Sequence, residues 1–419
     1  MTPASELDRE VGIGWYSTNG APCTGRARSF PEDFRVEERL VNLETSKEDL
    51  PGYLPLYRVE KRSVDTMHMS RALASALKSR VSYAGLKDKR ACAVQYVTPT
   101  SSRAARPLEV TGQGYSATLI GFVRRPLSRS VLAGNRFVIT LRGCCPDIEA
   151  RIEEAINLGR SRLVPNFYGL QRFGTSGAGS HRIGRSLVKG DFEGAVRSLL
   201  ESPADPVDRP SAEAFGRGDY EEGARLLASG RDVERLAARE LAQHPGQWTK
   251  ALRAIPVSLR RLYVHAYQSL IFNRTLCRAL EAGEDISRYV PGDNWAATSE
   301  GGLVTLAPRG VKDVPTGEAV PLVQVVGYAF RNYGSRFDSI IEDELKNEGV
   351  TPGQFYLKDM QEVSSEGAFR RPHIALQDPS WRVEDGNAKL EFTLGKGQYA
   401  TILLREIVKP QDPRAAGFA

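Results

Sequence analysis

The alternation of apolar and polar residues in the first third of the chain predicts a β-sheet. Residues 34–40, with the sequence FRVEERL, alternate with the period of two that turns one face of a strand toward a core. Other segments nearby are rich in β-branched and aromatic residues, which favour strands. The predicted strands are residues 34–40, 55–62, 93–98, 115–123 and 135–143. Because several connections between them are too short for a crossover helix, we expect a sheet that is largely antiparallel or mixed.

Helical periodicity marks a second kind of segment. In the first such segment, Val64, Leu73 and Leu77 recur at the spacing that places them on one face of a helix. A much longer segment, 258–280, carries a continuous apolar stripe and is expected to lie in the core. The predicted helices are residues 64–79, 147–159 and 258–280. Strands and helices together predict a protein of the α+β class.

A sheet-like pattern returns toward the C-terminus. Residues 321–330 are predicted to form a strand, and residues 390–408 a hairpin of two strands around the sequence GKGQ. At 419 residues the chain exceeds the roughly 250–300 residues that one core usually organises, so we expect two domains. If the terminal strands return to the first sheet, the middle of the chain is an inserted domain. The predicted division is a first domain of residues 1–165 and 375–419 and an inserted domain of residues 166–374.

Composition narrows the class of protein. The chain is 41% hydrophobic and 26% charged, and no run approaches the roughly 18 uncharged apolar residues of a membrane span. Glu6, Asp8 and Glu10 precede any apolar stretch, which is unlike a secretory signal. The five cysteines form no CxxC pair and leave an odd one, so neither a disulfide framework nor a zinc site is expected. We therefore expect a cytoplasmic protein with reduced thiols and no membrane partner.

The charge balance points weakly to a polyanionic partner. The net charge is +6 and the isoelectric point is near 9.0, which is compatible with nucleic-acid binding. Three arginine doublets are candidate phosphate contacts, although solvated surfaces explain such pairs equally well. The doublets are Arg124 and Arg125, Arg260 and Arg261, and Arg370 and Arg371.

The sequence lacks the motifs that usually hold nucleotide cofactors or catalytic metals. GIGWYS lacks the third glycine of GxGxxG, and GKGQ lacks the Ser or Thr that ends a phosphate-binding loop. HExxH and GxSxG are absent as well, and the five histidines are scattered without ligand spacing. The expected chemistry is therefore that of a carboxylate, without a cofactor or a metal.

The stretch SYAGLKDKRACAVQYVT, residues 82–98, places one acid among cations. Asp88 stands between Lys87 and Lys89, shortly after Gly85, in a loop between two predicted strands. Neighbouring cations favour an ionised carboxylate, which is a usable nucleophile or base, and they would attract phosphates around it. The ordinary interpretation is a solvated loop acid that pairs with its basic neighbours. The residues of the loop alone leave both interpretations open.

The same stretch resembles the catalytic motif of the TruD family of tRNA pseudouridine synthases. The resemblance rests on the glycine and on Leu86, Lys87 and Asp88 of YAGLKDKRACAVQY, with Ala91 and Gln95 following. Further blocks occur in the family's order and together cover the chain nearly end to end. These blocks are PEDFRVEE (31–38), GNRF (134–137), NFYGLQRFG (166–174), YQSLIFN (267–273) and GQYATILLRE (397–406).

The resemblance implies a fold and a reaction. The fold is a pseudouridine synthase catalytic domain with a mixed or antiparallel sheet, into which an α+β TRUD domain is inserted. The reaction is the cofactor-free isomerisation of a specific uridine of tRNA, expected at position 13, to pseudouridine, with Asp88 as the essential carboxylate. Asp88 would either attack the ribose carbon or remove a neighbouring proton. The target base must leave its stack, so an aromatic surface is needed to receive it.

The resemblance also implies candidates for substrate binding. Phe137 is the candidate surface for the flipped base, although its pattern also fits an ordinary strand core. Asn135 is expected to bond the uracil edge or to position the acid. Lys87 and Arg405 are the candidates for the cation that pairs with Asp88. The remaining candidates, expected to face RNA, are Asn166, Gln171 and Arg172.

The expected partner is tRNA, lying between the two domains, and no obligatory protein partner is evident. One alternative is a non-catalytic RNA-binding or chaperone protein that kept the fold. The intact GLKD string disfavours it, because binding alone has no use for a carboxylate that faces phosphates. A second alternative is an RNA base or sugar hydrolase that uses the same acid with water.

Overall fold

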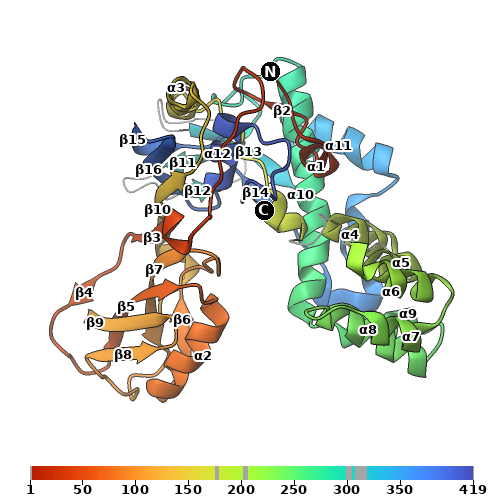
Figure 1. Ribbon diagram of the computed structural model, residues 1–419, viewed down its shortest axis with the longest axis horizontal. Helices are drawn as coiled ribbons and strands as arrows, with labels where there is room; N and C mark the ends of the chain where they lie inside the picture. The colour runs from red at the N-terminus through yellow and green to blue at the C-terminus, as the bar shows by residue number, and fades with distance from the viewer. Residues whose placement is uncertain (1, 175–178, 202–205, 299–303, 307–318, 419) are drawn as a thin grey trace.

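The computed structural model describes residues 2–174, 179–201, 206–298, 304–306 and 319–418. In the view of Figure 1, a lobe made mostly of strands, from residues 45–123, and a lobe of helices, from residues 180–254, lie on opposite sides of the molecule. The C-terminal strands and the two ends of the chain lie in the layer that joins them.

The largest sheet has ten strands within the described residues. In order across the sheet they are β15 (Leu376–Glu384), β16 (Asn387–Gly395), β10 (Leu132–Leu141), β3 (Phe34–Leu40), β7 (Cys92–Pro99), β5 (Leu54–Arg62), β9 (Tyr115–Val123) and β4 (Thr45–Ser46). Two more strands pair at its edges, β6 (Val81–Tyr83) with β7 and β8 (Glu109–Gly112) with β9. The β3–β7 pairing is parallel whereas β10, for example, pairs antiparallel with both neighbours. The predicted mixed sheet is therefore confirmed.

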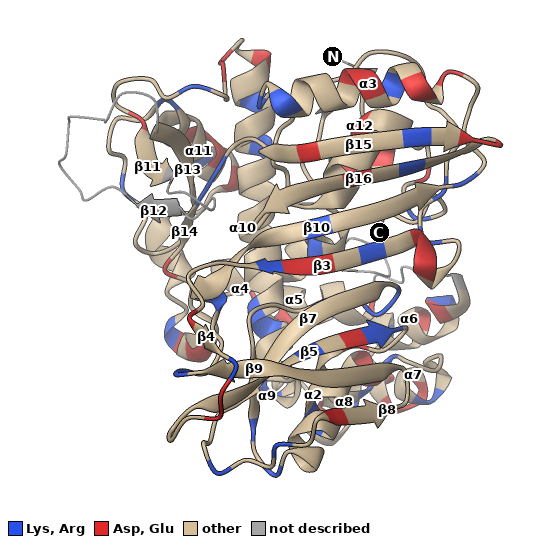
Figure 2. Ribbon diagram, turned by 90° about the vertical axis from the view of Figure 1, so that its left-hand side faces the viewer, with Lys and Arg blue, Asp and Glu red and all other residues tan. Residues whose placement is uncertain are grey.

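One face of this sheet is solvated and the other is packed, as the alternation in the sequence predicts. Figure 2 shows the solvated face, on which charged residues of both signs mark β3, β5, β15 and β16. On this face Arg136 forms ion pairs with Glu391 and Glu37. On the packed face Phe137 and Ile139 join one hydrophobic core with α3 (Ile148–Arg160) and α12 (Ala400–Val408). The sheet therefore has one side that faces water and one that is enclosed by helices.

Helices dominate the middle of the chain. The long helix α10 (Val257–Glu281) matches the predicted segment 258–280, and most of its apolar residues are buried, whereas Leu262 is 44% exposed. The other helices are α2 (Thr66–Ala76), α4 (Ser180–Lys189), α5 (Phe192–Leu200), α6 (Arg209–Gly216), α7 (Tyr220–Leu226), α8 (Asp232–Gln243), α9 (Trp248–Ala254) and α11 (Arg336–Glu348). Among the described helices, none is long and apolar enough to cross a membrane.

A smaller sheet lies beside α10. Its strands, in order, are β12 (Val304–Leu306), β11 (Asn294–Thr298), β13 (Ala319–Val325) and β14 (Ala368–Arg370). The predicted strand 321–330 corresponds to β13, which ends at Val325. The short elements are β1 (Thr2–Pro3), α1 (Glu6–Glu10), β2 (Trp15–Tyr16) and the 3₁₀ turns η1 (Pro31–Asp33), η2 (Arg129–Val131), η3 (Leu170–Phe173), η4 (Pro206–Asp208), η5 (Pro352–Phe355) and η6 (Lys358–Val363).

The predicted hairpin at residues 390–408 is wrong in its second half. The true hairpin is β15–β16, which pairs with β10, and the residues after GKGQ form helix α12 instead of a strand. Every residue of α12 is buried, including Arg405 and Glu406, so the helix has no exposed polar face that would reveal it as amphipathic. A short continuous apolar run does not distinguish a buried strand from a buried helix.

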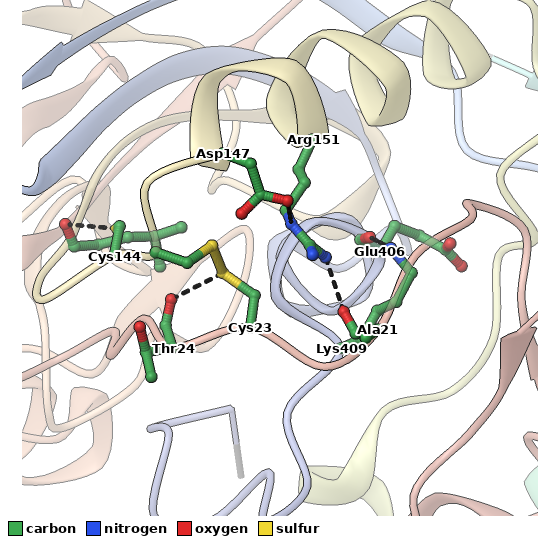
Figure 3. Close-up of a disulfide and its surroundings, with 10 residues drawn as sticks. Ala21, Cys23, Thr24, Cys144, Asp147, Arg151, Glu406 and Lys409 are labelled. Atoms are coloured by element: carbon green, nitrogen blue, oxygen red, sulfur yellow. Dashed lines mark hydrogen bonds and ion pairs between the residues drawn. A yellow bond between two sulfur atoms is a disulfide. The ribbon is translucent and has the colours of Figure 1, made fainter.

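The expectation of reduced thiols is wrong for one pair of cysteines. Cys23 and Cys145 form a disulfide with Cα atoms 5.8 Å apart, although they are 122 positions apart in sequence (Figure 3). Antiparallel bridging of Arg26 to Arg142 carries the two cysteines to the same place. Counting cysteines and their spacings does not reveal such a pair, because its two members are distant in sequence and meet only in the fold. The free cysteines are Cys92, Cys144 and Cys277.

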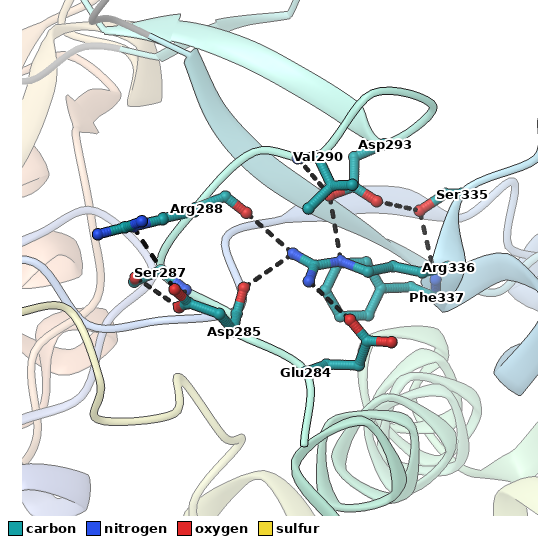
Figure 4. Close-up of polar contacts among 9 residues, drawn as sticks. All are labelled: Glu284, Asp285, Ser287, Arg288, Val290, Asp293, Ser335, Arg336 and Phe337. Atoms are coloured by element: carbon teal, nitrogen blue, oxygen red, sulfur yellow. Dashed lines mark hydrogen bonds and ion pairs between the residues drawn. The ribbon is translucent and has the colours of Figure 1, made fainter. Parts of the chain in front are cut away.

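Arg336 at the start of α11 binds the segment between α10 and β11 (Figure 4). Its Nε lies 3.2 Å from Asp293 Oδ2, and its Nη1 lies 2.9 Å from Glu284 Oε2. Its Nη2 donates to the carbonyl oxygens of Asp285 and Arg288, both at 2.9 Å. Burial raises the pKa of Asp293, and Arg336 opposes that shift. One guanidinium therefore neutralises a buried acid and satisfies two carbonyl groups.

Replacing Arg336 by methionine should lower the free energy of unfolding by about 3–5 kcal/mol, because Asp293 is left buried without its cation. The measurement is urea unfolding followed by circular dichroism. The matched control is Arg288→Met, since Arg288 is 84% exposed and forms only a solvated pair with Asp285. That control should change the free energy of unfolding by less than about 1 kcal/mol. Equal losses in the two variants would contradict the role assigned to Arg336.

Candidate active site

Asp88 lies in the loop of residues 84–91, which connects β6 to β7. The first turn of α2 anchors this loop, because the backbone N–H of Lys87 donates to Thr66 Oγ1 at 3.0 Å. Thr66 Oγ1 in turn donates to Gln95 Oε1 on β7 at 3.1 Å. Thr66 and Gln95 are both buried. The loop is therefore held by bonds inside the protein, and its backbone is fixed before any substrate arrives.

Arg28 is the cation that pairs with Asp88. Its Nη2 lies 2.9 Å from Asp88 Oδ2, and its guanidinium stacks over the Phe34 ring with a centroid distance of 4.3 Å. Nη1 donates to the carbonyl oxygen of Gly417 at 3.1 Å. The Arg28 side chain is 6% exposed whereas the Asp88 side chain is 38% exposed. Burial lowers the pKa of Arg28, and Asp88 opposes that shift. The pair thus combines a solvent-accessible carboxylate, Asp88, with a buried cation, Arg28.

Lys87 does not pair with the Asp88 side chain, contrary to the expectation from their adjacency. Its Nζ lies 2.6 Å from Glu38 Oε1, and the other carboxylate oxygen of Glu38 accepts the Tyr96 backbone N–H at 3.0 Å. Neighbouring side chains in an extended segment leave the backbone on opposite sides, so adjacency in sequence does not bring Lys87 to the acid. A Cβ on Gly85 would lie 3.3 Å from Lys87 Nζ. A side chain at Gly85 would therefore crowd this buried pair.

Lys61 on β5 holds the Asp88 backbone. Its Nζ donates to the carbonyl oxygen of Asp88 at 2.6 Å and to that of Val64 at 2.8 Å. The residue is 3% exposed. Burial lowers the pKa of Lys61 to about 8, while the nearby carboxylates of Asp88 and Asp65 act in the opposite direction. Lys61 is thus a buried amine that positions the loop through its backbone.

The lowered pKa of Lys61 predicts a pH dependence of stability. Below about pH 8 the folded protein buries a protonated amine; between about 8 and 10.5 only the unfolded chain still holds this proton. The contribution of Lys61 to stability should therefore rise with pH across this window. The measurement is the free energy of unfolding at pH 7, 8.5 and 10 for wild type and Lys61→Met. We expect the free energy of unfolding of wild type minus that of Lys61→Met to increase with pH. The same quantity for the exposed control Lys47→Met should show no such trend.

Asn135 and Phe137 lie on the packed face of β10, next to the loop. Asn135 is opposite Glu38 on β3, and its Oδ1 is buried without a hydrogen-bond partner among the described residues. Phe137 is 6% exposed and packs against Phe34 and Phe392, with ring centroids 6.0 and 5.6 Å away. The structure thus places Phe137 in the core, and it leaves Asn135 with an unused acceptor beside the Asp88 loop.

Asn166 is buried and uses its side chain inside the protein. Its Oδ1 accepts from Arg370 Nη2 at 2.7 Å, and its Nδ2 donates to the carbonyl oxygen of Arg371 at 3.1 Å. Asn273 in the YQSLIFN block joins the same segment to α10 by accepting the Tyr168 N–H at 2.8 Å and donating to the Tyr168 carbonyl at 3.0 Å. Two of the sequence blocks therefore meet in one hydrogen-bonded junction.

The other candidates expected to face RNA, Gln171 and Arg172, lie next to each other in η3. Gln171 is exposed, and Arg172 stacks at 5.2 Å over Tyr168. Arg405 is buried on α12, where its Nη2 lies 2.5 Å from Asp8 Oδ2. The expectation that Arg405 pairs with Asp88 is therefore wrong. It followed from placing Arg405 on a strand, whereas the helix turns its side chain toward the N-terminal segment.

Two of the three arginine doublets are engaged within the protein. Arg260 is buried against Glu362 and the Ile255 carbonyl. Arg370 is buried and bonds Asn166. The expectation that these two side chains meet phosphates is therefore wrong, because their charges are already enclosed. Arg124 is exposed and bonds the Tyr53 hydroxyl.

The sequence interpretation missed Arg28, Glu38 and Lys61. Each stands far from Asp88 in sequence, and each is a charged residue within or beside an ordinary strand pattern. One signal was present for Glu38, which falls at an inward position of the alternating strand 34–40, where a charge requires a partner. Arg28 carried no such signal, since it precedes the strand in an irregular segment.

One group in the described part of the chain brings three potential metal ligands together, namely Cys23, Cys145 and Asp147. The two sulfurs are bonded to each other, and an Asp147 oxygen is paired with Arg151 at 2.7 Å. This group therefore does not offer a ligand set for a metal.

The comparisons with known proteins cover almost the entire chain. The family model described as tRNA pseudouridine synthase D (TruD) matches residues 10–407. A protein of Methanosarcina acetivorans named "Probable tRNA pseudouridine synthase D" is 32% identical, with 96% of this chain and 97% of that protein aligned. A protein of the same name from Pyrobaculum neutrophilum is 35% identical over the full length of both chains.

A solved structure gives the same result for the fold. The crystal structure described as a tRNA pseudouridine synthase D from Methanosarcina mazei superposes with a TM-score of 0.76 at 28% identity. The superposition covers 97% of this chain and 98% of that chain. The chain therefore belongs to the TruD family of tRNA pseudouridine synthases and is an enzyme of the isomerase class.

Proposed function

We propose that this protein converts the uridine at position 13 of tRNA to pseudouridine, with Asp88 as the essential carboxylate. The observation that carries this assignment is the Arg28–Asp88 pair. It combines a carboxylate that is 38% exposed with a cation that is 6% exposed. A carboxylate held in this way is fixed in position by the buried cation while its outer side is free to meet a ribose.

The proposed reaction rearranges one nucleotide without an external reagent. The bond between ribose C1′ and uracil N1 breaks, and a bond from C1′ to C5 forms. The C5 proton is lost to solvent and N1 gains a proton, so atoms and charge balance. Asp88 either attacks C1′ or removes a proton from the neighbouring ribose carbon. Either role needs an anion close to the sugar, which the loop of residues 84–91 would supply.

The uracil must be flipped out of its stack to reach Asp88. We assign the unused Oδ1 of Asn135 to the N3–H of uracil, because this buried acceptor lacks a partner among the described residues. Phe137, two residues further on the same strand face, would form the apolar floor against which the base rests. Its contacts with Phe34 and Phe392 keep that ring in place.

The proposed domain division follows the expected boundaries. Residues 1–165 and 375–419 would form the catalytic domain, and residues 166–374 the inserted domain, with tRNA bound between them. The pairing of β16 with β10 supports this division, because it returns the C-terminal strands to the first sheet. The proposed compartment is the cytoplasm, where such a tRNA would be modified.

The test is tritium release from a tRNA transcript labelled at C5 of its uridines. Release should be stoichiometric with one uridine and should disappear when the uridine at position 13 is replaced by cytidine. Continued release from that substituted transcript would move the target to another uridine. Tight tRNA binding without release from any transcript would favour the RNA-binding alternative.

A further inference from the structure

A cavity of about 670 Å³ lies where the large sheet meets the small sheet. The first residues of β10 and the loop of residues 395–398 after β16 form one side, and β13 and β14 form the other. In Figure 2 the small sheet lies beside the end of the large sheet at which β16 ends. None of residues 84–91 lines the cavity, so it is distinct from the Asp88 loop.

The cavity is nevertheless close to that loop. Leu132 lines the cavity, and its Cδ2 lies 3.4 Å from the position that a Cβ on Gly85 would occupy. Asn135, three residues further along β10, is the proposed uracil contact. One strand end therefore separates the cavity from the proposed target site, and a single RNA strand could reach both.

Aromatic and cationic side chains line this cavity together. Phe369 is half-buried and Tyr333 is 42% exposed, so both offer ring surface to a ligand. The guanidinium of Arg370 stacks over Tyr168 at 4.0 Å, but its charge is enclosed by its bonds to Asn166. The cation open to a ligand is Lys396, which is exposed at the rim and whose Nζ also donates to the Arg129 carbonyl oxygen at 2.7 Å. Aromatic surface beside cations is the combination that holds a base and its phosphate.

Two buried amide side chains also line the cavity, each with a polar group left over. Gln398 is 6% exposed; its Oε1 accepts the N–H groups of Ala375 and Gly395, and its Nε2 has no partner among the described residues. Gln324 is 6% exposed; its Nε2 donates to Arg331 and Asp338, and its Oε1 is similarly unused in the described part of the chain. One free donor and one free acceptor therefore remain for a ligand.

We propose that this cavity is a second nucleotide site, which takes one unstacked base of the bound RNA next to the target uridine. The proposal rests on the proposed function, since it names a further contact with the same substrate. The rings stack the base, Gln398 and Gln324 bond its polar edge, and Lys396 meets the phosphate. Bonding by fixed amides to a base edge discriminates among bases, so the site would contribute sequence preference at a flanking position.

The first test replaces Gln398 by glutamate, which keeps an oxygen acceptor for the N–H groups of Ala375 and Gly395 but removes the free donor. The assay measures kcat/KM by tritium release on a set of tRNA transcripts, each changed at one nucleotide flanking the target. Wild type should prefer one base at one position. Gln398→Glu should lose about tenfold on that transcript and lose the preference.

A second variant, with a matched control, distinguishes loss of the site from a folding defect. Phe369→Ala should lower kcat/KM between about five- and a hundredfold on every transcript, because stacking does not depend on base identity. Tyr356→Ala is the matched control, since Tyr356 is a 45% exposed aromatic residue that does not line the cavity. It should stay within about twofold of wild type. Thermal unfolding of each variant verifies that the fold is intact.

The outcomes separate this proposal from the proposed function. Wild-type turnover with both variants equal to wild type on all transcripts would overturn the second site alone. If wild type turns over no tRNA, the proposed function fails. RNA affinity then tests the cavity, because an unchanged affinity of Phe369→Ala for RNA would overturn the second nucleotide site.

The mononucleotides AMP, GMP, CMP and UMP test whether the cavity binds a free small molecule. One that binds there without competing with RNA would assign the cavity to a small molecule and contradict the proposal.

Discussion

Asp88→Asn is expected to lower tritium release from tRNA by more than about a thousandfold, while RNA affinity stays within a few fold. The amide has nearly the shape of the carboxylate, but it can neither attack the ribose nor remove a proton from it. The substitution also removes a negative charge that repels phosphates, and this gain offsets the loss of any hydrogen bond that the carboxylate accepts from RNA. The measurements are single-turnover tritium release and filter binding with the same transcript.

The control for Asp88→Asn comes from an ion pair of the same kind elsewhere in the chain. Asp49 pairs with Arg106, and its side chain is 41% exposed, close to the 38% of Asp88. Asp49→Asn should therefore leave tritium release within about twofold of wild type. Residual activity of Asp88→Asn above about a tenth of wild type would remove Asp88 from the chemistry.

Arg28→Met is expected to lower kcat by about a hundred- to a thousandfold, the usual cost of removing one preorganised charge from an active site. The loss follows from the geometry, because Arg28 stacks on Phe34 and holds Asp88 Oδ2 at 2.9 Å. Arg28→Lys should recover part of the activity, since a lysine supplies the charge without the fixed fork of the guanidinium. Single-turnover rates for both variants provide the measurement.

Stability and activity should separate in Arg28→Met. Asp88 is partly exposed, so water replaces the lost cation and the free energy of unfolding should fall by only about 1–2 kcal/mol. Arg106→Met is the matched control, because Arg106 also pairs with an aspartate and lies 6.0 Å from the ring of Phe122. The two variants should lose similar stability, but only Arg28→Met should lose activity. Equal activities would show that the Arg28–Asp88 pair is merely structural.

Much of the architecture follows from local sequence pattern. The alternation of FRVEERL predicted β3 with its correct bounds, and the apolar stripe of 258–280 predicted α10 to within one residue at each end. These predictions succeed because the direction of side chains repeats with one characteristic period in a strand and with another in a helix. The pattern failed at α12, where burial on every side removes the polar face that would reveal a helix.

The candidate site was predicted only in part. The GLKD string located Asp88, since a glycine, a lysine and an acid in fixed order are visible without the fold. Its partner was not visible: Lys87 is adjacent and Arg28 is 60 positions away, yet Arg28 makes the ion pair. The same limitation concealed the Lys87–Glu38 pair and the Cys23–Cys145 disulfide.

The sequence by itself determined the class of fold, the long strands of the first sheet, the helix α10, the candidate carboxylate Asp88 and the family. Tertiary structure decided which cation supports that carboxylate, which lysine holds its backbone, and which arginines are enclosed and unavailable to RNA. The physical reason is that the two kinds of information depend on different separations, one along the chain and one in space. Periodicity and motif spacing act over a few residues of chain, whereas an ion pair depends on distances of a few ångströms that sheet register and chain crossings create.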